Sequence, residues 1–341
     1  MHRYAHCRIA SPLLVLILLL AGCDSQLQLV EQRILQFGTI IDVSLIHQDR
    51  AKAEQTLVNV EKQLALYRRY WHAWEDSDLS RFNHSLALMQ ATTIPPSLAE
   101  LIDLSHNYYR SSNGLFNPAL GKLIAAYGFH GQSKADQATI TMIQQDMPDM
   151  LDLKIEGRLA TSDNAHLQLD FGGIAKGYAI GQIANLLKQQ GYQHFLINAG
   201  GDLITSGNKF GNAWTLAVQN PFGPGAIASI ELTGAHSLFT SGNYQRFYRK
   251  DSKRLHHIID PRTGKPSTHI SSATVLTSDP VLADVAATTL MIDGLDSPAS
   301  LAQSLNIEDY LIVSEDQKIT ISRSFASKIK LISILPVTII D

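Results

Sequence analysis

Residues 167–198 read LQLDFGGIAKGYAIGQIANLLKQQGYQHFLIN, and this stretch predicts a strand, a turn, a helix and a second strand. Polar and apolar residues alternate over residues 167–171, with the period of two that is typical of a β-strand. Gly172-Gly173 then predict a tight turn. Apolar residues follow at helical spacing until Gly191 ends the helix, and the apolar run after it predicts the next strand.

The segments on either side of this stretch predict a mixed fold. A first strand is expected over residues 37–45, apolar spacings of three and four over 57–71 predict a long helix, and Pro-Pro-Ser at 95–97 begins another. Short strands are expected around Trp214, Ile227, Leu238, Phe247, Leu255 and Ala273, and a helix over residues 281–291. Long helices early and hairpin-like strands late indicate an α+β fold over residues 37–341. We expect a single large mixed domain with mostly antiparallel sheets and helices packed around them.

The composition is that of a folded protein. The chain has 341 residues, of which 45% are hydrophobic and 17% charged, so it can build a large core and is not intrinsically disordered. The net charge is -3 and no run of Lys and Arg is long enough to track a phosphate backbone, so we expect no nucleic-acid partner. With only 2 Cys, one of them in the N-terminal leader, any metal here must use oxygen or His ligands.

The N-terminus resembles the export signal of a bacterial lipoprotein. Arg3 and Arg8 precede an apolar run over residues 13–21, which is about half of the ~20 residues that a transmembrane helix requires. The small residues directly before Cys23 resemble the lipobox, in which the cysteine is diacylated and becomes the new N-terminus. We therefore expect a signal peptide over residues 1–22 and lipidation of Cys23. The alternative is an ordinary signal peptide in which Cys23 is incidental.

The lipid would hold the protein at a membrane. Two acyl chains suffice for stable anchoring, because each buried methylene contributes ~0.8 kcal/mol. Asp24, directly after the cysteine, resembles the residue that retains proteobacterial lipoproteins in the inner membrane. We therefore expect the folded domain on the periplasmic side of the cell inner membrane, joined to its anchor by a tether over residues 23–36.

The glycine-rich segment 169–178 is the first candidate functional site. Consecutive glycines at a helix start let backbone groups approach a ligand closely, and the helix N-terminus favours an anion. Lys176 would add a positive charge within the first turn. The alternative is a plain strand-to-helix turn with a solvated Lys176. The segment has neither the Gly-Lys-Ser/Thr of a P-loop nor the spacing of a dinucleotide-binding fingerprint.

A candidate base lies later in the chain. Residues 240–244 read TSGNY and residues 256–264 read HHIIDPRTG. The sequence DPRTG has the composition of a turn, and a strand that delivers His257 to its edge would place the imidazole at a surface cleft. The alternative, which is commoner, is a histidine without a catalytic role that precedes a turn whose backbone hydrogen bonds are satisfied.

A candidate metal pair lies in the helix expected over residues 281–291. Asp284 and Thr288 are i and i+4, so both oxygens lie on one face of the helix. A carboxylate and a hydroxyl are hard oxygen donors that suit Mg²⁺, which completes its shell with substrate phosphate and water. The alternative is that Asp284 acts as a cap near the start of the helix. Together with the anion site and the histidine, this pair suits attack on a pyrophosphate by a hydroxyl nucleophile.

The same segments carry a family resemblance. From about residue 37 to residue 291 the chain is similar to the ApbE family of FAD:protein FMN transferases, and the similarity depends on several motifs that occur in one order. These motifs are DLSRFN at 78–83, GLFNP at 114–118, the segment 169–178, NAGGD at 198–202, TSGNY at 240–244, and the segments 257–264 and 283–288.

The resemblance implies a reaction and a set of partners. The family transfers FMN from FAD, its substrate, to a Thr or Ser hydroxyl of an acceptor protein, which forms a phosphoester and releases AMP. Mg²⁺ is required as the cofactor. The acceptors are typically exported flavoprotein subunits of redox-driven ion pumps or related membrane electron-transfer complexes.

The resemblance also implies roles for individual residues. Asp284 and Thr288 would bind the metal together with the backbone carbonyl of Gly173, and His257 would be the base for the acceptor hydroxyl. The residues that would contact FAD are Phe37, Trp74, Leu115, Phe116, Asn117, Asp170, Lys176 and Ile258.

This chain departs from the family pattern at two of these positions. Phe37 stands where the family usually has Met, which preserves an apolar flavin contact. Asn117 stands where Asp is usual, which keeps the shape but loses a charge. Trp74 could stack on a flavin or adenine ring, with a buried core tryptophan as the alternative.

The same residues are compatible with two other functions. An FAD pyrophosphatase would use the same site with water as the nucleophile, giving FMN and AMP. A flavin-binding lipoprotein would store or deliver FAD without chemistry, but binding alone needs neither the metal pair nor His257. The sequence does not separate the transferase from the pyrophosphatase.

Overall fold

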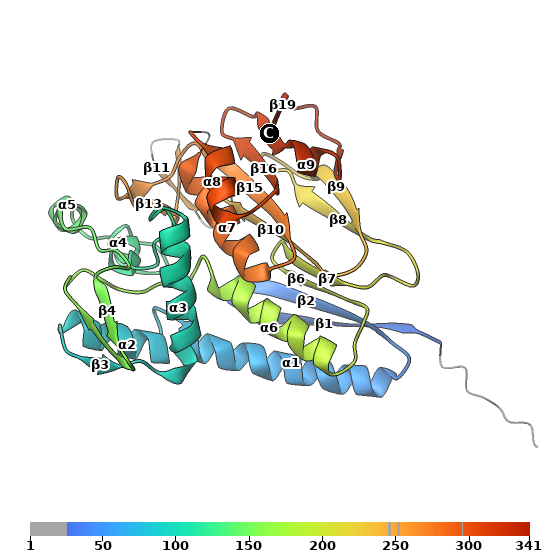
Figure 1. Ribbon diagram of the computed structural model, residues 1–341, viewed down its shortest axis with the longest axis horizontal. Coiled ribbons are helices and arrows are strands. Elements are labelled where there is room, and N and C mark those ends of the chain that lie inside the picture. The colour runs from blue at the N-terminus through green and yellow to red at the C-terminus, as the bar shows by residue number, and fades with distance from the viewer. Residues whose placement is uncertain (1–25, 245–246, 251–252, 295) are drawn as a thin grey trace, which may run out of the picture.

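The computed structural model describes residues 26–244, 247–250, 253–294 and 296–341 (Figure 1). The signal peptide expected over residues 1–22 and the lipidated Cys23 lie outside these residues, so both stay predictions. In the described part of the chain, no helix combines the length and the apolar character needed to cross a membrane.

A nine-stranded sheet forms the centre of the described structure. Its neighbouring strands pair antiparallel, except that β17 and β19 are parallel. This confirms the prediction of mostly antiparallel sheets. In spatial order the strands are β1 (Gln28–Gln36), β2 (Thr39–His47), β6 (Phe195–Ala199), β7 (Asp202–Ser206), β10 (His236–Gly242), β15 (Ile270–Thr277), β16 (Asp309–Ser314), β17 (Ile319–Ser322) and β19 (Val337–Ile340).

Four smaller sheets surround the central one in the residues that the structure describes. Two have three strands: β18 (Lys330–Leu331), β9 (Ala226–Leu232) and β8 (Trp214–Gln219) in one, and β3 (Thr92–Thr93), β5 (Leu159–Ser162) and β4 (Leu153–Glu156) in the other. Two are hairpins: β11 (Phe247–Lys250) with β12 (Lys253–His256), and β13 (Ile259–Asp260) with β14 (Lys265–Pro266).

Helices cover one face of the central sheet (Figure 1). α1 packs on β1 and β2, α6 packs on β6 and β7, and α7 crosses β10 and β15 and also contacts α6. The helices are α1 (Arg50–Trp71), α2 (Asp78–Ala87), α3 (Pro96–Ser111), α4 (Gly121–Ala126), α5 (Gln137–Gln145), α6 (Ala175–Gln189), α7 (Pro280–Asp293), α8 (Pro298–Leu305) and α9 (Arg323–Ala326).

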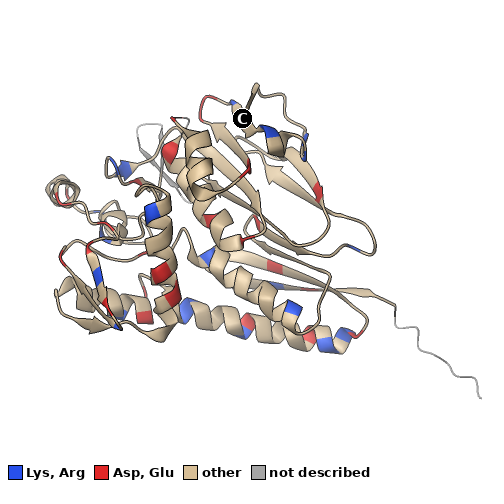
Figure 2. Ribbon diagram, viewed as in Figure 1, with Lys and Arg blue, Asp and Glu red and all other residues tan. Residues whose placement is uncertain are grey.

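Two apolar cores lie on opposite faces of the central sheet. On the helical face, α1 buries the stripe predicted from the sequence, which includes Leu57, Val60 and Leu64. On the other face, Trp214 and Ile230 of the β8–β9 sheet pack on side chains of β10, β15 and β16. The result is a single mixed domain of three layers, which confirms the α+β prediction. Figure 2 shows Lys and Arg interspersed with Asp and Glu along α1, whereas α6 carries only Lys and α7 only Asp.

Two local predictions are wrong. Residues 28–36, expected in the tether, form the edge strand β1, because pairing with β2 lets Val30 and Ile34 enter the core. The strand expected over 167–171 is reduced to a single bridge between Gln168 and Leu120. There the side chain of Asn83 bonds to both backbone groups of Leu169, at 2.8 Å each, so a neighbouring strand cannot pair with Leu169 on that side.

Candidate active site

The site begins where α6 and α7 pack closely. A β-carbon at Gly177 would overlap the carbonyl oxygen of Pro280 and would lie 2.8 Å from Cβ of Asp284. A β-carbon at Gly181 would lie 2.7 Å from Cγ of Pro280. Glycine at these two positions therefore lets the first two turns of α6 touch the first turn of α7, which brings the glycine-rich segment to Asp284.

Asp284 caps α6 from outside that helix. The N-cap residue of α6, Ile174, offers no side-chain acceptor, and Oδ2 of Asp284 accepts a hydrogen bond of 2.8 Å from the backbone N–H of Gly177. α7 has its own cap, Asp279, whose carboxylate accepts from the N–H groups of Val281 and Leu282. The alternative that Asp284 caps its own helix is therefore wrong. A carboxylate at the start of α6 is also favoured by the helix dipole.

Two buried carboxylates flank Lys176. The side chain of Lys176 forms an ion pair with Asp202, whose other oxygen accepts a hydrogen bond of 2.9 Å from the N–H of Thr240. Asp284 is only 4% exposed, and burial raises its pKa, while the charge of Lys176 and the Gly177 N–H oppose that shift. A cation is thus held at the start of α6 between two carboxylates, and the binding of an anion at this turn stays a prediction.

The three groups expected to bind a metal are neighbours. A β-carbon at Gly173 would lie 3.4 Å from Oγ1 of Thr288, and that oxygen lies 3.2 Å from Oγ of Ser241. Asp284 lies one turn before Thr288 on α7. One carboxylate, one hydroxyl and a backbone carbonyl are the donors that Mg²⁺ takes, so this set fits the ion. Among the described residues, no three His, Cys, Asp or Glu side chains form a metal-binding group, so a mainly carboxylate or histidine site is not present there.

A Gly177→Ala variant should lose stability because the added methyl meets backbone rather than a flexible side chain. We expect the free energy of unfolding to fall by about 1–3 kcal/mol, the usual cost of overpacking. Urea denaturation of the variant measures this change. A matched control is Gly223→Ala, since a β-carbon at Gly223 meets nothing closer than 3.9 Å. Equal stability of the two variants would contradict the close packing of α6 on α7.

Aromatic rings gather on the other side of the glycine-rich turn. Trp74 and His130 are stacked, with ring centroids 5.4 Å apart and an angle of 13° between the rings. His257 meets His130 edge-on at 5.5 Å and Phe129 at 6.4 Å. Three segments that are distant in sequence, after α1, after α4 and after β12, thereby place their rings together.

Asp170 connects the rings to the metal-binding groups. Its Oδ1 accepts a hydrogen bond of 2.9 Å from the N–H of Gly172, and its Oδ2 lies 3.9 Å from Nε2 of His130. Gly172 is followed by Gly173, where an added β-carbon would lie 3.4 Å from Oγ1 of Thr288. A continuous line of contacts therefore runs from His257 through His130 and Asp170 to the oxygen donors of α7.

The GLFNP turn supplies apolar walls. A β-carbon at Gly173 would lie 3.3 Å from Cε2 of Phe116, and Leu115 and Ile258 belong to one apolar cluster with α7. Both amide atoms of Asn117 bind backbone: Nδ2 donates to Pro148 at 2.9 Å and Oδ1 accepts from Ala119 at 3.1 Å. The side chain thus shapes the turn, and its expected contact with FAD stays a prediction.

Phe37 lies at the edge of this region. It has a positive φ of 53° in the turn between β1 and β2. Thr39, at the start of β2, lies so close to Gly200 that a β-carbon at Gly200 would overlap the hydroxyl of Thr39. The turn of Phe37 therefore lies beside the turn that leads to Asp202, the partner of Lys176.

The two adjacent histidines have different environments. His256, at the end of β12, is fully buried, whereas His257 is half-buried beside the rings described above. Burial lowers the pKa of His256 to about 4, while a backbone hydrogen bond with Ser267 and the charge of Glu315 oppose the shift. Of these two adjacent histidines, only His257 is therefore placed to exchange a proton with a ligand.

The buried His256 predicts acid sensitivity. An unfolded histidine binds its proton near pH 6.5, whereas His256 in the folded state binds one only near 4. Between these values the unfolded state holds more protons, so the free energy of unfolding falls as the pH falls, by about 3 kcal/mol in full. Denaturation curves from pH 7 to pH 4 should show this loss, and His256→Phe should reduce it. The control variant His84→Gln, at an exposed position, should keep the full loss of stability at low pH. Equal pH dependence of the two variants would contradict the assignment of this loss to His256.

Sequence reasoning missed three residues that the structure brings to the site. Asp202 and Ser241 stand within the quoted motifs, but nothing in their spacing indicates contacts with Lys176 and Thr288. His130 stands in a glycine-bounded segment, residues 128–131, that has the composition of an ordinary loop. Its positive φ of 56° is a turn feature and carries no signal of its partners.

Comparisons with known proteins show which family this chain is similar to. The model of the ApbE family matches residues 37–311. A Rhodobacter capsulatus protein named FAD:protein FMN transferase is 30% identical over 89% of this chain, and the chain spans 60% of that relative's length. A Klebsiella pneumoniae protein of the same name is 30% identical over 82% of the chain and 83% of its own length. The crystal structure of the ApbE protein from Thermotoga maritima, 25% identical, superposes with a TM-score of 0.78 over 88% of this chain and 99% of its own.

Proposed function

Because the chain belongs to the ApbE family, we propose that it transfers FMN from FAD to a Thr or Ser hydroxyl of an exported acceptor protein and releases AMP, with Mg²⁺ as the cofactor. The observation that carries this proposal is the convergence of Gly173, Asp284 and Thr288 at the start of α6. Relatives named FAD:protein FMN transferase support the same reaction.

The start of α6 is suited to the pyrophosphate of FAD. Backbone N–H groups at a helix N-terminus bind phosphate oxygens, and glycines at 172 and 173 let the phosphates approach the backbone. Lys176, paired with Asp202, lies at the same place. Mg²⁺, when bound, would neutralise charge on the phosphate oxygens as the bridge is broken. Asp284 and Thr288 would hold it from the side of α7.

The aromatic group is suited to the flavin end of FAD. Trp74, His130 and Phe116 offer ring faces or edges beside the glycine-rich turn. A flavin ring system packs favourably against such side chains, since aromatic pairs contribute about 0.5–1.5 kcal/mol beyond their buried area. Held by these rings, the FMN half would lie between α6 and His257.

His257 is placed to activate the acceptor. Its imidazole would take the proton of the acceptor hydroxyl, while that oxygen bonds to the phosphorus of the FMN half. The bond from that phosphorus to the bridging oxygen breaks, and AMP leaves with the bridging oxygen. His130, beside both His257 and Asp170, would keep the imidazole oriented toward the pyrophosphate.

We further propose that the acceptor lies close to the membrane surface. If Cys23 carries the lipid, only residues 24–27 separate it from strand β1, which begins at Gln28. Four extended residues span at most about 14 Å, so the domain cannot move far from the bilayer. This supports an acceptor that is a subunit of a membrane redox complex, on the periplasmic side of the inner membrane.

The reaction is tested with the purified full chain, FAD, Mg²⁺ and a fragment of an exported flavoprotein that carries a candidate Thr or Ser. Mass spectrometry of the fragment and chromatography of free AMP are read together. A fragment that gains the mass of FMN, with one AMP for each, supports the proposal. AMP with an unmodified fragment would mean a pyrophosphatase, and neither product would mean a flavin-binding protein.

A further inference from the structure

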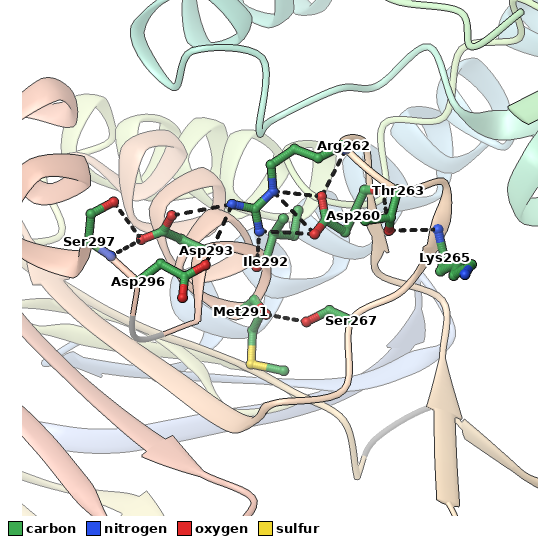
Figure 3. Close-up of polar contacts among 10 residues, drawn as sticks. All are labelled: Asp260, Arg262, Thr263, Lys265, Ser267, Met291, Ile292, Asp293, Asp296 and Ser297. Atoms are coloured by element: carbon green, nitrogen blue, oxygen red, sulfur yellow. Dashed lines mark hydrogen bonds and ion pairs between the residues drawn. The ribbon is translucent and has the colours of Figure 1, made fainter. Parts of the chain in front are cut away.

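The hairpin that follows His257 is attached to the end of α7 (Figure 3). The last four carbonyls of a helix have no partner within it. In α7, the carbonyl of Met291 accepts a hydrogen bond of 2.6 Å from Oγ of Ser267, and that of Ile292 accepts one of 3.2 Å from Nη2 of Arg262. The β13–β14 hairpin therefore satisfies two of the carbonyls that α7 leaves open.

Arg262 is held rigidly in this position. Its Nε donates to Oδ1 of Asp260 at 3.0 Å and its Nη2 donates to Oδ2 at 2.9 Å, a two-point contact that fixes the plane of the guanidinium. The backbone N–H of Arg262 also donates to Oδ1 of Asp260, at 2.8 Å. On the other side Nη1 lies 3.9 Å from carboxylate oxygens of Asp293 and Asp296. One side chain thus joins the hairpin to the last turn of α7.

This attachment matters because the central sheet does not position His257. In the described residues, β11–β12 and β13–β14 are two-stranded sheets separate from the nine-stranded one, and His257 lies between them. The far end of the hairpin is held by Gly264, whose carbonyl accepts from Tyr127 at 2.8 Å and from Gln144 at 3.0 Å. Arg262 and Ser267 supply the attachment on the side of α7, the helix that carries Asp284 and Thr288.

We propose that Arg262 is a positioning residue for the transfer reaction. Through Asp260 and the end of α7 it sets the position of His257 relative to the metal pair of α7. This inference rests on the proposed function, in which the base and the metal pair act on one phosphate. A displacement of about 1 Å between reacting groups can cost about a hundredfold in rate. Except for Ile258, the residues proposed to bind FAD lie outside this hairpin, so binding should change little.

The kinetic test compares Arg262→Ala, Arg262→Lys and wild type with the same FAD, Mg²⁺ and acceptor fragment. We expect kcat to fall at least tenfold in Arg262→Ala with a KM for FAD within about twofold of wild type. Added guanidinium chloride at low millimolar concentration should restore part of the rate, because the Arg262 side chain is 46% exposed and its site is open to solvent. Arg262→Lys keeps the charge and solubility but not the two-point contact, so its kcat should also fall. A kcat at the wild-type level in Arg262→Lys would overturn the proposal.

A second measurement does not depend on activity. Hydrogen exchange should increase over residues 257–267 and at the end of α7 in Arg262→Ala. It should stay at the wild-type level in Arg323→Ala, which breaks an exposed ion pair with Asp341 elsewhere. Unchanged exchange at the hairpin would overturn the role of Arg262. If instead wild type makes no FMN-modified acceptor, the proposed function fails while the exchange result still tests the attachment.

Discussion

Replacing Asp284 by alanine should lower Mg²⁺-dependent turnover by at least about a thousandfold, because the change removes the charged oxygen donor expected to bind the metal. It also removes the acceptor for the Gly177 N–H, so the start of α6 loses its cap. Steady-state release of AMP over a Mg²⁺ titration measures the effect.

Two variants separate the loss of the metal ligand from the loss of the helix cap in Asp284→Ala. Asp284→Asn keeps an oxygen that can accept from Gly177 but lacks the charge, so it should remain folded and still lose most of its turnover. Asp279→Ala removes the cap of α7, which costs about 1 kcal/mol, and should leave kcat nearly unchanged. Full Mg²⁺-dependent activity in a folded Asp284→Asn protein would eliminate Asp284 as a metal ligand.

Replacing His257 by alanine should lower FMN transfer by about 10²–10⁴-fold, the range that general-base catalysis contributes. The rings of Trp74 and Phe116, which we propose bind the flavin, remain in place, so FAD should bind with near wild-type affinity. Flavin fluorescence titration measures the binding, and the mass of the acceptor fragment measures the transfer.

The control for His257 is His84→Ala, at an exposed position on α2. This variant should transfer FMN at the wild-type rate. If His257→Ala also transfers normally, the base must be another group, and His130 would be the nearest candidate because its ring contacts that of His257. Loss of FAD binding along with transfer would instead assign His257 to binding.

Much of the fold follows from local pattern. The apolar spacing over residues 57–71 predicted α1, and Pro-Pro-Ser at 95–97 predicted the start of α3. Where local pattern failed, a distant partner decided the outcome. Residues 167–171 alternate like a strand, but Asn83 bonds the backbone groups of Leu169 that a neighbouring strand would need on that side. Residues 28–36 are strongly mixed in polarity, and only pairing with β2 makes them a strand.

In the candidate site, too, some features follow from local sequence and others depend on distant contacts. The sequence by itself determined that Asp284 and Thr288 share one face of α7, since the 3.6-residue period of a helix sets that spacing wherever the helix lies. Only the tertiary structure decided that Asp284 caps α6, that His130 lies between Trp74 and His257, and that Arg262 joins its hairpin to the end of α7. The physical reason is that spacing within one element depends on local backbone geometry, whereas contacts between distant segments depend on how the whole chain packs its core.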